Sequence, residues 1–132
     1  MTPIATFADE IAAVNAAVQT WFNGTEEAGF LDRLMDHFSD DCSVVLPDGT
    51  LLDKVSLRDV FAARGGLRPK LTIEITEIAL VAEWDGGAVA SYVERQNDGV
   101  GNRNARRSTV LFVRDEEGTP RWCRLHETFF KE

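Results

Sequence analysis

Basic residues and long apolar runs are scarce in this 132-residue chain. It has 14 Lys and Arg against 22 Asp and Glu, and a net charge of -8 opposes a nucleic-acid phosphate backbone. No segment approaches the roughly twenty apolar residues that span a bilayer, and the first residues lack the basic and apolar regions of a signal peptide. We therefore expect a cytoplasmic protein that binds neither nucleic acid nor membrane.

Cysteine and histidine are also rare, with two of each. Cys42 and Cys123 lie far apart in the chain and have no partner at metal-ligand spacing, so we expect buried thiols in a reducing compartment. His37 falls on the polar side of a predicted helix, where a solvated imidazole is expected, and His126 lies most of the chain away. The sequence therefore predicts no metal site and no cofactor.

Apolar and aromatic residues are plentiful, at 44% hydrophobic with eight Phe and three Trp, enough for the core of one domain over residues 1–132. Apolar residues recur at steps of three and four from Phe7 to Asn23, with Thr6 as a helix cap and Gly24 as a stop. Two more helices are predicted, one from the cap Thr25 to about residue 38 and one from Ser56 to the glycines at 65 and 66.

From Leu71 onward the apolar period changes to two, which is typical of strands. A phase shift near Glu77 predicts a β-bulge that bends the sheet. Further strands are expected at 88–97, 105–114 and after the turn at 115–118, and a small hairpin at 42–52. Helices first and a meander last predict an α+β domain: three helices pack on a strongly curved, mainly antiparallel sheet and form a cone with an internal pocket.

Alternation places Tyr92 and Glu94 on one face of their strand, and Arg107 and Thr109 on one face of the next. If both faces are concave, these side chains converge in the pocket. Glu94 would then need Arg107 as its partner, because an unpaired buried carboxylate is costly or takes up a proton. A buried Glu with a raised pKa suits a general acid or base. The alternative is that Glu94 and Arg107 form a cross-strand ion pair on the solvated face.

The last strand carries one candidate polar group on each face. Its two faces are Trp122, Arg124, His126, Thr128 and Phe130 on one side, and Cys123, Leu125, Glu127 and Phe129 on the other. The second face is more apolar, so we expect Glu127 inside the cone and His126 on the outer surface. A bulge would reverse this assignment, so both remain candidates for the pocket. Trp21 and Phe61 are the aromatic candidates for ligand contact on the helices.

Three segments carry a recognisable pattern. They are FSDDCSVVLPDG at Phe38 to Gly49, AVASYVERQ at Ala88 to Gln96, and RWCRLHETF at Arg121 to Phe129. With the order of the elements, they resemble the nuclear transport factor 2-like superfamily, whose cystatin-like fold is a cone of curved sheet and three helices. The resemblance covers nearly the whole chain and is nearest to small bacterial domains similar to the calcium/calmodulin-dependent kinase II association domain, with SnoaL-like proteins also on this fold. It implies a homodimer through the outer surface of the sheet.

The chain also departs from these relatives at positions that carry function. Ketosteroid isomerases have their general base just before the hairpin proline, where this chain has Leu46, so that form of the isomerase mechanism is not supported. The association domain has pocket arginines where this chain has Glu94 and Phe129, which predicts that the positive character of the pocket is largely lost. SnoaL-like cyclases use acidic and histidine side chains inside the cone, which this chain offers by analogy.

Two hypotheses about function follow. In the first, the protein binds an unidentified small molecule, and Glu94 or Glu127, helped by Tyr92, performs acid/base chemistry of the isomerase, cyclase or dehydratase type. In the second, it is a non-catalytic association module whose sheet face makes oligomers. A polar cluster at the bottom of an open pocket favours the first hypothesis, and a wholly apolar interior favours the second.

Overall fold

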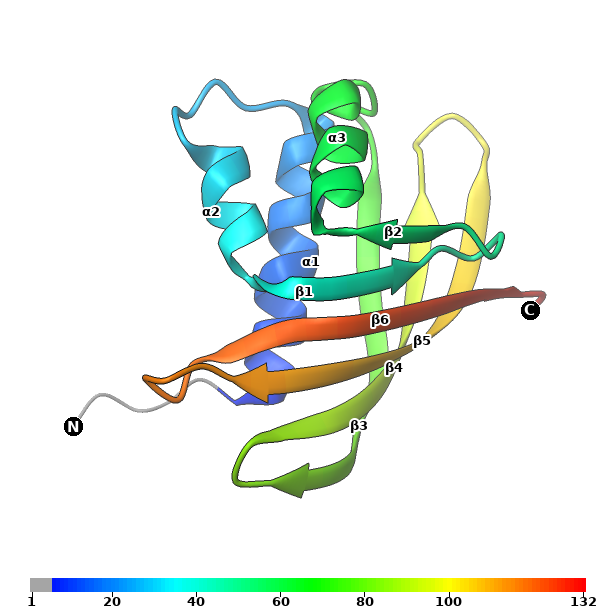
Figure 1. The fold of residues 1–132 in the computed structure, drawn as a ribbon. Coiled ribbons are helices and arrows are strands. Elements are labelled where there is room, and N and C mark those ends of the chain that lie inside the picture. The colour runs from blue at the N-terminus through cyan, green and yellow to red at the C-terminus, as the bar shows by residue number, and fades with distance from the viewer. Residues whose placement is uncertain (1–5) are drawn as a thin grey trace.

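Three helices and a six-stranded sheet make up the computed structural model, which describes residues 6–132 (Figure 1). The elements are α1 Phe7–Asn23, α2 Phe30–Asp36, β1 Phe38–Val45, β2 Leu51–Asp53, α3 Lys54–Arg64, β3 Thr72–Trp84, β4 Gly87–Asn97, β5 Arg103–Arg114 and β6 Pro120–Phe130. The strand order is β2-β1-β6-β5-β4-β3, and every neighbouring pair is antiparallel except β1 with β6. The predicted α+β class, with three helices and a mainly antiparallel sheet, is confirmed.

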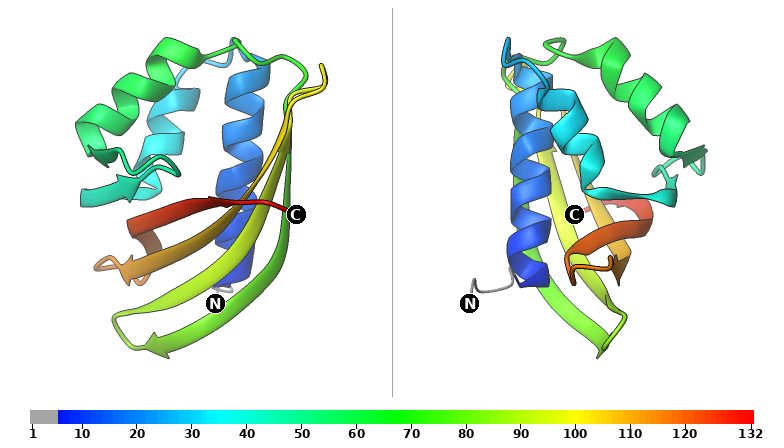
Figure 2. Two further views of the ribbon diagram at one scale, coloured as in Figure 1. Left: turned by 90° about the vertical axis from the view of Figure 1, so that its right-hand side faces the viewer. Right: turned by 60° about the vertical axis from the view of Figure 1, so that its left-hand side comes forward.

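The sheet is strongly curved, and the helices lie on its concave side (Figure 2). A bulge interrupts the pairing of β3 with β4 between Thr76 and Ala79. Glu77 lies in this bulge with a φ of 55°, a left-handed conformation that is uncommon for a residue other than glycine. The bulge predicted near Glu77 is thus confirmed, and the extra residue bends the strand as such insertions do.

Local capping signals set both ends of α1 as predicted. Thr6 accepts a hydrogen bond from the Asp9 backbone N–H at 3.1 Å, and Gly24 ends the helix with a φ of 113°. In α3 the cap is Asp53 rather than Ser56, because the Asp53 carboxylate accepts the Ser56 backbone N–H at 2.8 Å.

The second helix is shorter than the sequence pattern predicts. It runs only from Phe30 to Asp36, and Thr25 forms a local turn with the Glu27 backbone N–H instead of capping it. The chain becomes a strand at Phe38 because this residue pairs with Trp122 of β6. Tertiary pairing therefore overrides the helical pattern at the end of this segment.

The core is centred on aromatic rings from three elements. Phe112 and Trp122 are 0% and 1% exposed, and the Phe112 ring lies 5.2 Å from the rings of both Phe7 and Trp122. In β6, Cys123 is an extra residue between the pairs Phe112 with Trp122 and Leu111 with Arg124. The prediction that Trp122 shares the outer face with Arg124 is therefore wrong, because this bulge reverses the facing of the strand.

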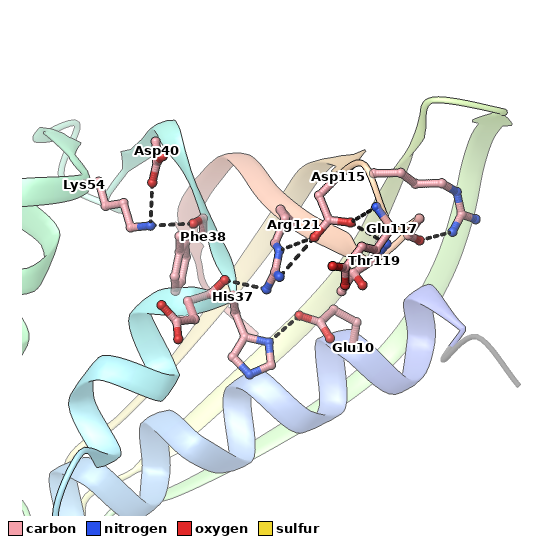
Figure 3. Close-up of polar contacts among 12 residues, drawn as sticks. Glu10, His37, Phe38, Asp40, Lys54, Asp115, Glu117, Thr119 and Arg121 are labelled. Carbon is pink, nitrogen blue, oxygen red and sulfur yellow. Dashed lines mark hydrogen bonds and ion pairs between the residues drawn. The ribbon is translucent and has the colours of Figure 1, made fainter. Parts of the chain in front are cut away.

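A buried carboxylate ties α1 to the sheet. Glu10 accepts a hydrogen bond from the indole N–H of Trp122 at 3.2 Å. The same oxygen lies 2.7 Å from Nδ1 of His37, at the end of α2 (Figure 3). Nearby, the Arg121 guanidinium donates to the Asp36 carbonyl at 2.6 Å. His37 is thus half-buried in this cluster, and the expectation of a solvated imidazole is wrong.

The cysteines are free thiols in neighbouring strands of the sheet. Cys42 is buried as expected, whereas Cys123 is half-exposed, and burial raises the pKa of the Cys42 thiol.

Within the described chain, no helix has the length and apolarity needed to cross a membrane.

Replacing Phe112 by Ala should lower the free energy of unfolding by about 3–5 kcal/mol, because it leaves a cavity among fully buried rings. Urea unfolding followed by tryptophan fluorescence measures this loss. Phe129→Ala is the matched control, since Phe129 is 50% exposed, and it should cost about 1 kcal/mol or less. Equal losses in the two variants would contradict the assigned core.

Candidate functional site

A partly open cavity of about 150 Å³ lies between the helices and the concave face of the sheet. Its helical wall is mainly apolar, with Val14, Val18, Phe22, Leu57, Val60 and Phe61, and also carries Asn15 and Arg64. The sheet side contributes apolar residues such as Val44 and Leu125 together with a polar group, Tyr92, Glu94, Gln96, Arg106 and Glu127. A cavity of about this volume holds a single six-membered ring.

Strand register decides which side chains reach this cavity. Across β4, β5 and β6, Tyr92 pairs with Ser108 and Ser108 with Glu127, while Glu94 pairs with Arg106. Residues directly opposite one another point to the same face, so these side chains converge.

Arg107 and Thr109 lie outside the cavity, contrary to prediction. They are exposed on the outer face of β5, opposite Val93 and Ser91. The register of the β4–β5 hairpin places Arg106 beside Glu94, and the guanidinium in the cavity is therefore that of Arg106. Sequence alternation identified two faces of β5 but could not show which of them continues the face of Tyr92.

Two buried carboxylates share this one guanidinium. Arg106 donates to Glu127 at 3.0 Å, and its Nε lies 4.0 Å from Glu94. Glu94 also accepts a hydrogen bond from Gln96 at 2.5 Å. Because Glu94 and Glu127 are only 4% and 7% exposed, the alternative of an ion pair on the solvated face is wrong.

The environment favours a proton on Glu127 and on Tyr92. Burial, and then the charge of Glu94, raises the pKa of Glu127 to about 7, against the opposing effect of Arg106. Burial, followed by the charges of Glu94 and Glu127, raises the pKa of Tyr92. Glu127 can therefore gain or lose a proton near neutrality, whereas Tyr92 remains a hydrogen-bond donor.

Ser108 was not predicted from the sequence. It is 2% exposed between Tyr92 and Glu127, and its hydroxyl lies beside the Tyr92 phenol, where it opposes the rise in the Tyr92 pKa that burial causes. The same alternation that selects Arg106 would have selected Ser108, had the hairpin register been known.

Only one of the two aromatic candidates on the helices lies at the cavity. Phe61 lines the cavity, but Trp21 does not, because its indole N–H donates to the Phe61 carbonyl at 2.7 Å and its ring stacks on Phe30 at 6.1 Å. The next residue, Phe22, lines the cavity instead. Leu46 also lies in the wall, where the isomerases carry their base.

In the last strand Glu127 points inward, as expected, and His126 is exposed on the outer face opposite Thr109.

Three arginines, Arg64, Arg68 and Arg106, line the cavity. The expected loss of positive character is therefore wrong, because the arginines come from positions other than those compared with the association domain. No group of three or more His, Cys, Asp or Glu side chains within residues 6–132 is arranged to hold a metal ion.

Three helices on the concave side of a curved, mainly antiparallel sheet are the architecture of the cystatin-like α+β folds. A crystal structure of an NTF-2 like protein of unknown function from Pseudomonas aeruginosa is 42% identical, with a TM-score of 0.90, and the match covers 95% of this chain and 98% of that one. The chain therefore belongs to the nuclear transport factor 2-like (NTF2-like) family.

More distant structures share the fold alone. A candidate calcium/calmodulin-dependent protein kinase type II association domain from Thiobacillus denitrificans is 15% identical, with a TM-score of 0.74 and coverage of 99% of this chain and 100% of that one. A candidate aromatic ring hydroxylase from Novosphingobium aromaticivorans is 17% identical, with a TM-score of 0.69 and coverage of 95% and 87%. No protein-family model matches the sequence, and a search of the curated proteins gives no significant match.

The raised pKa of Glu127 should make stability depend on pH. In the unfolded chain this group has a pKa near 4.5, so the folded state holds the extra proton between that pH and about 7. The stabilisation is complete below pH 4.5 and is lost as the pH rises through 7. From about pH 5 to pH 8, the free energy of unfolding of the wild type should fall relative to Glu127→Gln by up to about 3 kcal/mol.

Urea unfolding at a series of pH values measures this difference. Glu94→Gln should reduce it, because the charge of Glu94 raises the pKa of Glu127. Parallel pH profiles for the wild type and Glu127→Gln would contradict the assignment.

Proposed function

We propose that this protein binds a small, largely apolar molecule in the cavity and that Glu127 transfers a proton to or from it. The observation that carries the proposal is that Glu94 and Glu127, both buried, share the Arg106 guanidinium in the wall of the cavity. Two negative charges beside one positive charge favour keeping one proton, and the low dielectric of the apolar walls strengthens this preference. Reactions of the isomerase, dehydratase or cyclase type need such a group.

Each neighbouring group has a defined part in this chemistry. A ligand carbonyl oxygen would accept a hydrogen bond from the hydroxyl of Tyr92, which lines the cavity together with Glu127. The Glu127 carboxylate would take a proton from the carbon next to the carbonyl, and the C–H electron pair would form an enolate that this donor stabilises. Returning the proton to a different carbon gives isomerisation, and giving it to a leaving hydroxyl gives dehydration.

Cyclohexanone tests the proton transfer without knowledge of the natural substrate, because one ring fits the cavity and its carbonyl activates the adjacent C–H bonds. In D₂O near neutral pD, the wild type should speed exchange of these hydrogens for deuterium, measured by proton NMR. Glu127→Gln should lower the protein-dependent rate by about 100-fold or more.

Two variants on α3 show whether the exchange occurs in the cavity. Val60→Phe fills the cavity and should abolish the protein-dependent exchange, whereas Val55→Phe, at a position 71% exposed on the same helix, should retain it. Exchange that persists in Val60→Phe or in Glu127→Gln would overturn the proposal.

A second candidate function rests on the outer face of the sheet. A broad hollow there is lined by Val89, Arg107, Thr109, Leu111, Arg124, His126 and Thr128. Arginine together with apolar side chains is typical of the core of protein interfaces. We propose that this face associates with a second copy of the chain, which would make the protein a homodimer.

Light scattering tests the dimer directly. The wild type should have twice the 14.7 kDa mass of the chain, and Leu111→Glu should return the mass of one chain, because it places a charge in the hollow. Leu67→Glu, at a site 67% exposed outside this hollow, is the control and should remain dimeric. A monomeric wild type at micromolar concentration would remove the proposal.

A further inference from the structure

The cavity wall carries more positive than negative charge. It has three guanidiniums, from Arg64, Arg68 and Arg106, and two carboxylates, from Glu94 and Glu127. Arg106 lies within ion-pair distance of both carboxylates. No carboxylate of residues 6–132 lies within that distance of Arg64 or Arg68. In a protein with a net charge of -8, this surplus is the reverse of the overall balance.

Arg68 is held in place with most of its donors unused. Its backbone N–H donates to the Phe22 carbonyl at 2.9 Å, and its own carbonyl accepts from the Asn23 side chain at 3.0 Å. The guanidinium lies 5.9 Å from the centre of the Phe22 ring and donates once, to Gln96 at 3.2 Å. A guanidinium has five N–H donors, so an oriented, largely unsatisfied cation faces the cavity.

Nearby acidic groups do not cancel this charge. Asp98 is close enough for Arg68 to contribute to lowering its pKa, although its hydrogen bonds with Asn102 and Val100 contribute more. Its two oxygens already accept the backbone N–H groups of Val100 and Asn102 and the Asn102 side chain. The Asp98 carboxylate therefore already accepts hydrogen bonds from donors in its own turn.

The positive groups and the proton-transfer group occupy different depths. Arg64, in the last turn of α3, is exposed, and Arg68 is half-buried, so both mark the rim. Tyr92 and Glu127, by contrast, are almost completely buried. A ligand with an anionic end and an apolar body would match this gradient from rim to floor.

We infer that the cavity selects a small organic carboxylate of about one-ring size, with its carboxylate bound by Arg64 and Arg68 and its apolar body directed toward Tyr92 and Glu127. The inference rests on the proposed function and adds the class of substrate. A guanidinium binds a planar carboxylate through two parallel hydrogen bonds, and a positive rim also attracts anions from solution. The volume of about 150 Å³ sets the limit on size.

Benzoate and benzyl alcohol test the inference, because they share one ring and differ in charge. Dissociation constants are measured by NMR titration near pH 7.5 at low salt. The wild type should bind benzoate at least about 5-fold more tightly than benzyl alcohol. In the double variant Arg64→Gln with Arg68→Gln, the two ligands should bind about equally.

A matched double variant, Arg103→Gln with Lys131→Gln, removes two exposed positive charges that do not line the cavity and should keep the preference for benzoate. Equal binding of the two ligands to the wild type would overturn the carboxylate inference and leave the binding cavity intact. A preference that survives in Arg64→Gln with Arg68→Gln would overturn the assignment to these residues. Failure of both ligands to bind would overturn the inference, and the cyclohexanone exchange decides the proposed function separately.

Discussion

The register of β4, β5 and β6 is the constraint on which the site depends. It aligns Tyr92, Ser108 and Glu127 across three strands and sets Glu94 against Arg106. Side chains alternate between the faces of a strand, so a slip of one residue would replace this entire set with the outward-facing one. The set of side chains in the cavity therefore depends on the pairing of the strands as well as on the identity of each residue.

Burying this cluster opposes stability unless its charges are balanced. Desolvation of two carboxylates costs more than one shared guanidinium returns, and uptake of a proton relieves the imbalance. The raised pKa of Glu127 is the result of this imbalance. The arrangement that disfavours the charged state of Glu127 is also the one that allows it to exchange a proton near neutral pH.

The helices complete the site by closing it. α1 and α3 provide the apolar wall, and the buried Glu10 fastens α1 to the sheet through the indole of Trp122, beside His37. The Cys123 bulge makes this possible, because it turns Trp122 inward while leaving Glu127 inward on the same strand. Core and cavity thus share one irregularity in β6.

The sequence by itself determined features that depend on neighbours in the chain: both ends of α1 at Thr6 and Gly24, the bulge at Glu77, and the alternation that marks Tyr92 and Glu94 as one face. Only the tertiary structure decided the partner of Glu94, the facing of Trp122 and the place of the rim arginines. These depend on pairing between strands and on loops that set the register, and such long-range contacts leave no local periodicity to detect.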